Sequence, residues 1–147
     1  MKTPVPPHPN ILLVDDNQDG LLVRRTVLEE LGYGVSIAEN GEDGLKLYQS
    51  ADFDLVVTDY RMPRMNGAEL IRRIRKLDPN ARIILLSGFA EVLGLTEENT
   101  GADVVIAKSS SELAHLTRSV KRLLNRATRK PPASQKRAPA RAGLVSG

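Results

Sequence analysis

Cysteine is absent from this 147-residue chain, and so are long apolar runs. Without cysteine, disulfides and thiolate metal sites are excluded. No apolar run approaches the roughly 18 residues needed to cross a membrane, and the first residues, MKTPVPPHPN, lack the apolar core of a signal peptide. With 41% hydrophobic and 27% charged residues, the composition is typical of one soluble globular domain. We therefore expect a cytoplasmic protein with no membrane segment.

Acidic residues are missing from the C-terminal segment. Residues 126–147 contain six basic residues and no acidic one, so the rest of the chain holds 15 basic and 18 acidic side chains. The segment is rich in Pro, Ala and Arg and poor in large apolar residues, which predicts a disordered tail or a linker. The expected organisation is a flexible arm at 1–9, a folded domain at 10–125 and a basic tail at 126–147. Weak nucleic-acid contact through this tail is the less favoured alternative.

Five short apolar runs recur along the chain without alternating polar residues, as in strands that are buried on both faces. They are ILLV (11–14), VSIA (35–38), LVV (55–57), IILL (83–86) and VVIA (104–107). Segments with helical periodicity lie between them, so strand and helix alternate. This order predicts an α/β fold of three layers: a parallel sheet with right-handed crossovers and helices on both faces.

Two helical patterns predict buried faces. The first consists of Leu21, Leu28 and Leu31, with Gly32 placed to end the helix. The second consists of Leu70, Ile71, Ile74 and Leu77, and its outer, solvated face carries Arg72, Arg73, Arg75 and Lys76.

The starts of the later helices are less regular. Ser109 and Glu112 have the spacing of a capping box that opens the last helix. The stretch AEVLGLTEEN (90–99) contains a glycine and has weak periodicity, so we expect a short or mobile helix there.

Polar side chains follow the predicted strands at their carboxyl ends, where open parallel sheets bind ligands. Asp15 and Asp16 follow the first strand, Asp59 follows the third, Ser87 ends the fourth and Lys108 follows the fifth. Three converging carboxylates repel one another unless a cation lies among them. Lys108 supplies one positive charge, and a divalent ion that prefers oxygen ligands, such as Mg²⁺, would supply two more.

A carboxylate beside Mg²⁺, a hydroxyl and an ammonium group is suited to phosphoryl transfer, because the cations neutralise charge on the equatorial oxygens. One carboxylate can then act as the nucleophile and become an aspartyl phosphate. Asp59 is the best candidate, because it stands alone at its strand end while the adjacent acidic pair holds the ion.

Over residues 10 to about 125, the chain resembles a response-regulator receiver domain of two-component signalling. The resemblance rests on four motifs in matching order and spacing: LLVDDN, VVTDYRMPRMNG, LLSG and GADVVIAK. It implies a flavodoxin-like, doubly wound sheet of five parallel strands in the order 2-1-3-4-5, with five helices. It also implies a phosphoacceptor that is not an enzyme for a separate substrate. The donor would be a histidine kinase or a histidine phosphotransfer protein.

The resemblance assigns roles in a metal site. Asp59 resembles the phosphoacceptor, Asp16 a direct metal ligand, and Asp15 a ligand that acts mainly through water. The main-chain carbonyl of Arg61 would complete the protein's share of a site for Mg²⁺, with Mn²⁺ as an alternative ion.

The resemblance also assigns roles around the phosphoryl group. Ser87 resembles the switch hydroxyl that bonds a phosphoryl oxygen, and Lys108 resembles its partner charge. Gly88 leaves room for the phosphoryl group. We further expect Arg61 and Phe89 to line the approach to Asp59 and to tune the lifetime of the phosphorylated form.

Two positions depart from the family's pattern. Val105 stands where receivers often carry an aromatic residue that swings inward, and valine is too small and too stiff for that motion. Ser109 stands where proline normally follows the lysine, often after a cis bond; a cis bond before a residue other than proline costs roughly 2.5–4 kcal/mol. We therefore expect either a trans bond with a displaced Lys108 or a strained cis bond.

Three other functions stay open. The fold could serve as a non-phosphorylated interaction module, for example as a homodimer through its last helices. A nucleic-acid binder would use the basic helix and the tail, with a steep dependence on salt. A metal-dependent phosphatase is more distant, because it would want a second acid two residues after its nucleophile, where this chain has Arg61.

Overall fold

Five parallel strands form the central sheet in a computed structural model that describes residues 8–88 and 94–129, the last four without their side chains. The strands are β1 (Asn10–Val14), β2 (Gly34–Ala38), β3 (Leu55–Asp59), β4 (Ile83–Ser87) and β5 (Val104–Ala107). The described helices are α1 (Gln18–Glu30), α2 (Gly41–Ser50), α3 (Gly67–Leu77), α5 (Glu97–Thr100) and α6 (Glu112–Arg129). The strand order is β2-β1-β3-β4-β5, so the predicted flavodoxin-like topology is confirmed.

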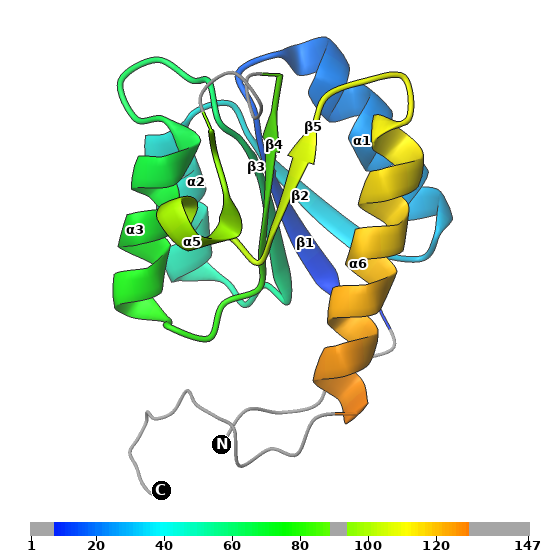
Figure 1. The fold of residues 1–147 in the computed structure, drawn as a ribbon. Helices are drawn as coiled ribbons and strands as arrows, with labels where there is room; N and C mark the ends of the chain where they lie inside the picture. Colours follow the sequence, from blue (N-terminus) through cyan, green and yellow to red (C-terminus); the bar gives the residue numbers. More distant parts are fainter. Residues whose placement is uncertain (1–7, 89–93, 130–147) are drawn as a thin grey trace, which may run out of the picture.

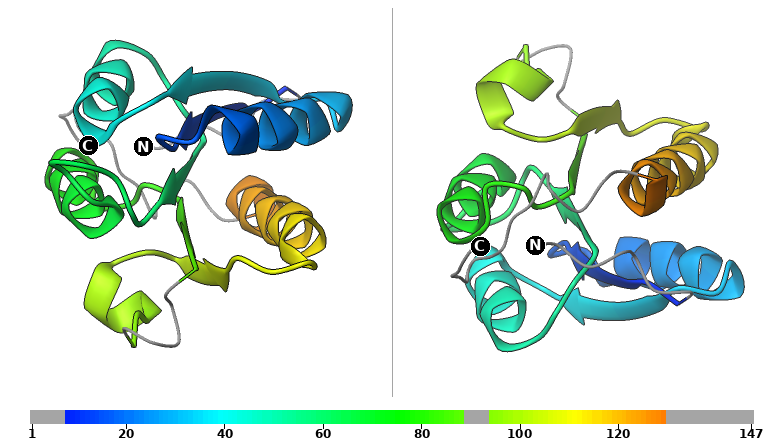
Figure 2. Two further views of the ribbon diagram at one scale, coloured as in Figure 1. Left: turned by 90° about the horizontal axis from the view of Figure 1, so that it is seen from above. Right: turned by 90° about the horizontal axis from the view of Figure 1, so that it is seen from below.

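The helices cover both faces of the sheet in three layers. Helices α1 and α6 lie on one face, and α2, α3 and α5 lie on the other (Figures 1 and 2). Along β1, Ile11 and Leu13 face the α1–α6 side, while Leu12 and Val14 face the α2–α3 side. All four are at most 1% exposed. Because both faces of the strand are buried, every one of these positions is apolar and none alternates with a polar residue.

Asparagine side chains start three of the helices. Asn17 accepts a hydrogen bond from Gly20 N–H, Asn40 from Asp43 N–H and Asn66 from Glu69 N–H. Each carbonyl oxygen satisfies one of the N–H groups that a helix leaves without an internal partner. These caps fix where the helices begin: Asn17 and Asn40 lie three and two residues past the end of a strand, and Asn66 lies seven residues past the end of β3.

Two residues expected on buried helix faces are exposed, so those two predictions are wrong. Leu31 is 42% exposed because α1 ends at Glu30, and the left-handed Gly32 (φ 98°) then turns the chain away. Leu77 is 52% exposed because it is the last residue of α3. In both cases the apolar pattern runs to the end of the helix or one residue past it, where the side chain is exposed.

The predicted capping box at the last helix is also wrong. The Ser109 hydroxyl accepts from Ser111 N–H at 3.3 Å, and the Glu112 carboxylate is bound to Arg24 at 2.7 Å. Of the stretch 90–99, residues 90–93 lie outside the described residues. The helix α5 that follows has four residues and begins with a capping box between Thr96 and Asn99.

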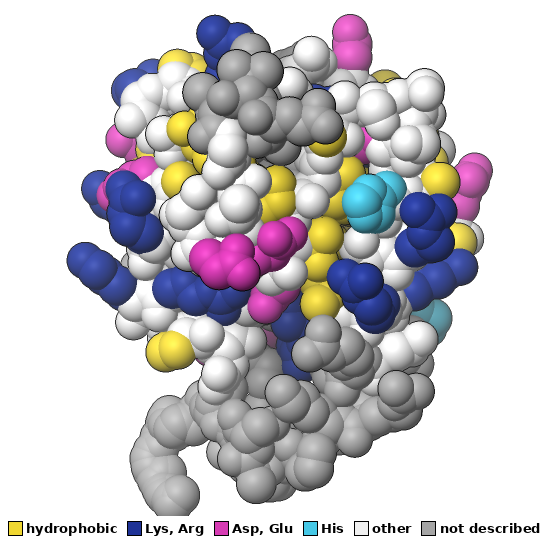
Figure 3. Space-filling view, in the orientation of Figure 1, with side chains coloured by type: hydrophobic (Ala, Val, Ile, Leu, Met, Phe, Trp, Pro, Cys, Tyr) yellow, Lys and Arg dark blue, Asp and Glu magenta, His cyan; other side chains and the backbone are white. Residues whose placement is uncertain are grey.

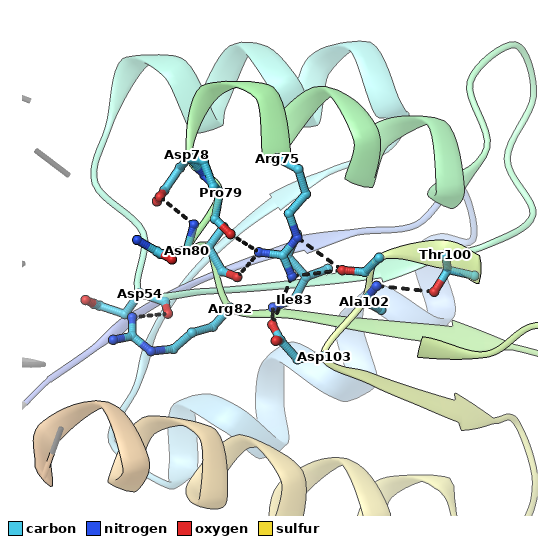
Figure 4. Close-up of polar contacts among 12 residues, drawn as sticks. Asp54, Arg75, Asp78, Pro79, Asn80, Arg82, Ile83, Thr100, Ala102 and Asp103 are labelled. Atoms are coloured by element: carbon cyan, nitrogen blue, oxygen red, sulfur yellow. Dashed lines mark hydrogen bonds and ion pairs between the residues drawn. The ribbon is translucent and has the colours of Figure 1, made fainter. Parts of the chain in front are cut away.

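Arg75 was expected on the solvated face of α3, and it lies instead in a hydrogen-bonded network (Figure 4). Its guanidinium donates to the carbonyls of Pro79 (3.0 Å), Ala81 and Gly101 (2.8 Å), and it pairs with Asp103 at 3.2 Å. The network joins the end of α3 to the loops before β4 and β5. A single side chain thus satisfies three main-chain carbonyls that no helix or strand pairs.

The rest of the α3 basic face is solvated as expected. Arg72 and Arg73 are more than half exposed, and both pair with Glu69 of their own helix. On the face shown in Figure 3, acidic side chains gather over α5, and basic ones flank them over α3 and α6. Among the described residues, no helix combines the length and the apolar content needed to cross a membrane.

We expect Arg75→Ala to lower the free energy of unfolding by about 2 kcal/mol, because it leaves several carbonyls without a donor. Arg73→Ala is the matched control on the same helix. It removes one exposed ion pair, so its effect should stay within about 0.5 kcal/mol. Urea unfolding of both variants measures the difference, and equal effects would contradict the proposed role of the network.

Candidate functional site

Three carboxylates meet at the carboxyl edge of the sheet. In the pairing of β1 with β3, Val14 lies opposite Thr58, so the next residues, Asp15 and Asp59, are neighbours. One oxygen from each of Asp15, Asp16 and Asp59 lies within 4.8 Å of the others. Asp15 and Asp59 are buried and Asp16 is exposed. The predicted convergence of these acids is therefore present.

An open cavity of about 590 Å³ lies above these carboxylates. It is lined by the three acids and by Asn17, Arg61, Met62, Pro63, Gly88 and Lys108. The cavity is open at Gly88, since an added Cβ there would meet no atom within 4 Å apart from its chain neighbours. The cavity gives a small anionic ligand access to Asp59 from solvent.

Lys108 reaches Asp59 from β5. Its Nζ lies 2.6 Å from Asp59 Oδ1, an ion pair in which the buried oxygen makes no well-directed hydrogen bond. Burial raises the pKa of Asp59; Lys108 opposes this rise, and the charge of Asp15 adds to it. Asp59 is therefore a buried acid whose negative charge is balanced chiefly by Lys108.

The peptide bond between Lys108 and Ser109 is trans. The lysine nevertheless contacts Asp59, because Lys108 N–H is held at 3.1 Å from Ser87 O and its side chain extends across the strand ends. Both expected alternatives are therefore wrong, because the bond is trans and Lys108 is not displaced from Asp59. Proline is thus not needed here to direct the lysine to the carboxylate.

Ser87 ends β4 with 1% exposure, opposite Ala107 of β5. It is near the acids through the sheet register, since Asp59 lies opposite the preceding residue, Leu86. Arg61 is exposed and lines the cavity. Phe89, expected to line the approach, lies outside the described residues.

Val105 is half-buried on the α2–α3 side of the sheet. Its N–H points to the outer edge of β5 and donates to the Glu97 carboxylate of α5 at 2.9 Å. The small side chain of Val105 thus occupies the position where an aromatic residue was expected. Its strand, β5, is hydrogen-bonded to α5 at the outer edge of the sheet.

Arg24 was not among the predicted site residues. Its Nη1 lies 2.7 Å from Asp15 Oδ2, and its Nε lies 2.7 Å from Glu112 Oε2. Burial opposes its charge, but the two carboxylates outweigh burial and raise the pKa of Arg24. The signal in the sequence is position: residues 21, 24 and 28 are spaced i, i+3, i+7, so a charged residue occupies the buried stripe of α1.

The donor set fits a hard divalent cation. All three acidic groups offer carboxylate oxygens, the ligands that Mg²⁺ prefers, and the open cavity leaves room for the waters that it keeps. Two cationic side chains and three carboxylates leave the edge net negative before Glu112 is counted. A dication would complete the charge balance.

The fold and this acidic edge define a class: a doubly wound α/β protein with a cation-binding site at the carboxyl ends of its strands. Residues 11–121 match the family model of the response regulator receiver domain. The chain belongs to this family.

Individual relatives agree with the family match. The response regulator receiver protein CpdR of Brucella abortus is 32% identical over 114 residues, which are 78% of this chain and 95% of CpdR. A response regulator receiver protein of an Anaeromyxobacter species is 42% identical over 76 residues, which are 52% of this chain. The match spans only 32% of that relative's length.

Solved structures share the fold. The response regulator protein TrrA of Thermotoga maritima, in complex with Mg²⁺–BeF, is 36% identical with a TM-score of 0.71 and covers 78% of this chain and 98% of its own. TrrA has also been solved in complex with the histidine kinase ThkA.

The raised pKa of Asp59 predicts a dependence of stability on pH. Folding favours the neutral acid, so ionisation opposes folding once the pH rises through this raised pKa. Near pH 7 and without divalent ions, we expect Asp59→Asn to raise the free energy of unfolding by on the order of 1 kcal/mol. Urea unfolding of the variant and the parent measures this difference. The advantage should shrink as the pH falls below the raised pKa of Asp59, because the parent's folded carboxyl is then protonated as well.

The control for this comparison is Asp52→Asn, at an exposed position outside the site. It should not reproduce the pattern. A gain for Asp59→Asn that is equally large at every pH would show that charge at Asp59 is not its source.

Proposed function

We propose that this chain is a phosphorylatable signalling switch that accepts a phosphoryl group on Asp59. The donor would be a histidine kinase or a histidine phosphotransfer protein. One observation carries the proposal: one oxygen from each of three carboxylates lies within 4.8 Å of the others, and the Lys108 ammonium group lies 2.6 Å from Asp59, one of the three. The relative TrrA, solved with Mg²⁺–BeF and with a histidine kinase, supports this reading by similarity.

The metal site would use the acidic edge. Asp16, exposed at the cavity, would bind Mg²⁺ directly, with Asp59 and the main-chain carbonyl of Arg61. Asp15 would act mainly through water, because Arg24 already occupies one of its oxygens and Asn17 N–H the other. Mn²⁺ is the expected substitute. When bound, the ion would neutralise charge on the transferring phosphoryl oxygens.

Asp59 would act as the nucleophile. A carboxylate oxygen attacks phosphorus while the bond from phosphorus to the donor's histidine nitrogen breaks, and the nitrogen keeps the bonding electrons. Lys108 would then turn from the carboxylate to a phosphoryl oxygen. The Ser87 hydroxyl would bond a second oxygen and report phosphorylation to the strand end, while Gly88, Arg61 and Phe89 set access. Slow hydrolysis of the acyl phosphate by water would return Asp59 to its free form.

The remaining features follow from this role. A kinase partner would place the chain in the cytoplasm, with residues 10–125 as the receiver, 1–9 as an arm and 126–147 as a tail or linker. A homodimer remains an additional partner to test. Nucleic-acid binding is not favoured, since three of the basic side chains of α3 already have partners: Arg72 and Arg73 pair with Glu69, and Arg75 donates to main-chain carbonyls.

Incubation with acetyl phosphate and Mg²⁺ tests the proposal directly. We expect an adduct of about 80 Da by intact-mass spectrometry, lost when a chelator is added. Asp59→Ala should abolish it, and Asp52→Asn, at an exposed position outside the site, should leave it unchanged. An adduct that persists in Asp59→Ala would place the acceptor elsewhere.

If neither acetyl phosphate nor a panel of histidine kinases yields an adduct, the non-phosphorylated interaction module becomes the better description. The departure at Val105 is the observation that favours this second candidate, because the small side chain cannot serve as an aromatic rotor. The contact between Lys108 and Asp59 favours the first.

A further inference from the structure

Arg24 is a buried cation that the proposed phosphoryl chemistry does not use. It lies on α1 between Leu21 and Leu28, and only 9% of its side chain is exposed. A charge in such a place is costly unless it is paired and hydrogen-bonded. Arg24 meets that condition by bridging two carboxylates from different elements, Asp15 after β1 and Glu112 at the start of α6.

The local backbone is built to admit this bridge. A Cβ at Gly20 would lie 3.0 Å from Arg24 Nη1 and 3.4 Å from Asp15 Oδ2, so a larger residue would press on the ion pair. Gly20 lies in the first turn of α1, and glycine is a poorer helix former than alanine, by roughly 1 kcal/mol in a helix interior. The bridge supplies a reason for glycine at this position.

Arg24 and a metal ion would compete for the same carboxylate. Asp15 Oδ2 accepts from Arg24 at 2.7 Å, and Asp15 Oδ1 accepts from Asn17 N–H at 3.0 Å. A cation entering the site meets an Asp15 whose charge is already offset. Glu112 has the opposite effect on metal binding. Its negative charge offsets part of the positive charge of the guanidinium, so the charge of Asp15 is neutralised less completely.

We propose that Arg24 is a positioning residue that weakens Mg²⁺ binding by holding Asp15, and that Glu112 tunes this effect from α6. The inference rests on the proposed function, since it takes the acidic edge to be a Mg²⁺ site. Because coupling is reciprocal, Mg²⁺ binding loosens Arg24 from Asp15 and shifts it toward Glu112. Glu112, at the start of α6, lies four residues after Lys108. The acidic edge is therefore connected to residues 108–112 twice: through Arg24 to Glu112, and through Asp59 to Lys108.

Two variants should move the Mg²⁺ affinity in opposite directions. Arg24→Met removes the competing cation, so Mg²⁺ should bind about 3–10-fold more tightly; Glu112→Gln leaves the full guanidinium charge on Asp15, so binding should weaken about 2–5-fold. Isothermal titration calorimetry of the full chain with MgCl₂ gives both dissociation constants. A residue that merely holds the fold together would weaken binding in both variants, because either change would loosen Asp15.

Matched controls lie on the same helix. Arg25 and Glu29 form an exposed ion pair at 3.1 Å, so Arg25→Met and Glu29→Gln repeat the same chemical changes away from the site. Both should bind Mg²⁺ within about twofold of the parent. Arg24→Lys keeps the charge and should return the affinity toward that of the parent. If Arg24→Met does not fold, Arg24→Gln removes the same charge with a polar side chain, and the same tighter binding of Mg²⁺ is expected.

The outcomes separate the two proposals. If the parent chain does not bind Mg²⁺, the proposed function fails and the inference fails with it. If the parent binds but the Arg24 and Glu112 variants shift the affinity in the same direction, or not at all, the inference alone is overturned. Opposite shifts, with unchanged controls, support the bridge as a device that sets metal affinity.

Discussion

Repulsion among three carboxylates at one edge of the sheet is the constraint on which this structure depends. The register of β1 on β3 forces Asp15 beside Asp59, and burial prevents water from screening the two charges. Two cationic side chains relieve the repulsion, and they come from opposite ends of the chain: Arg24 on α1 and Lys108 after β5. The apolar sheet beneath must hold the acids together against their mutual charge.

The two cations differ in what they can do next. Lys108 pairs with Asp59 and a third of its side chain is exposed, so it can turn to an incoming anion at the loss of that one contact. Arg24 is buried, and its guanidinium is bound to two carboxylates. It can therefore only move closer to Asp15 or closer to Glu112. One cation is therefore suited to binding a ligand, and the other to setting the conditions under which a ligand binds.

The sequence predicted the sheet and the acidic edge because both depend on strong local signals. Five uninterrupted apolar runs define the strands, and polar residues at their ends define the edge. Arg24 and Arg75 were missed because their partners come from distant parts of the chain: Glu112 and the carbonyl of Gly101. The exposure of Leu31 and Leu77 was missed because both lie at the end of a helix, and periodicity does not reveal where the buried face of a helix stops.

The hydrogen bond from Val105 to Glu97 has a consequence beyond the receiver chemistry. Strand β5 lies at the margin of the sheet, where unpaired main-chain groups can recruit a strand from another molecule. The Glu97 carboxylate takes up one of these donors and places negative charge on that margin. A helix of only four residues thus removes one free donor from this edge and adds a negative charge to it, and both changes oppose edge-to-edge aggregation.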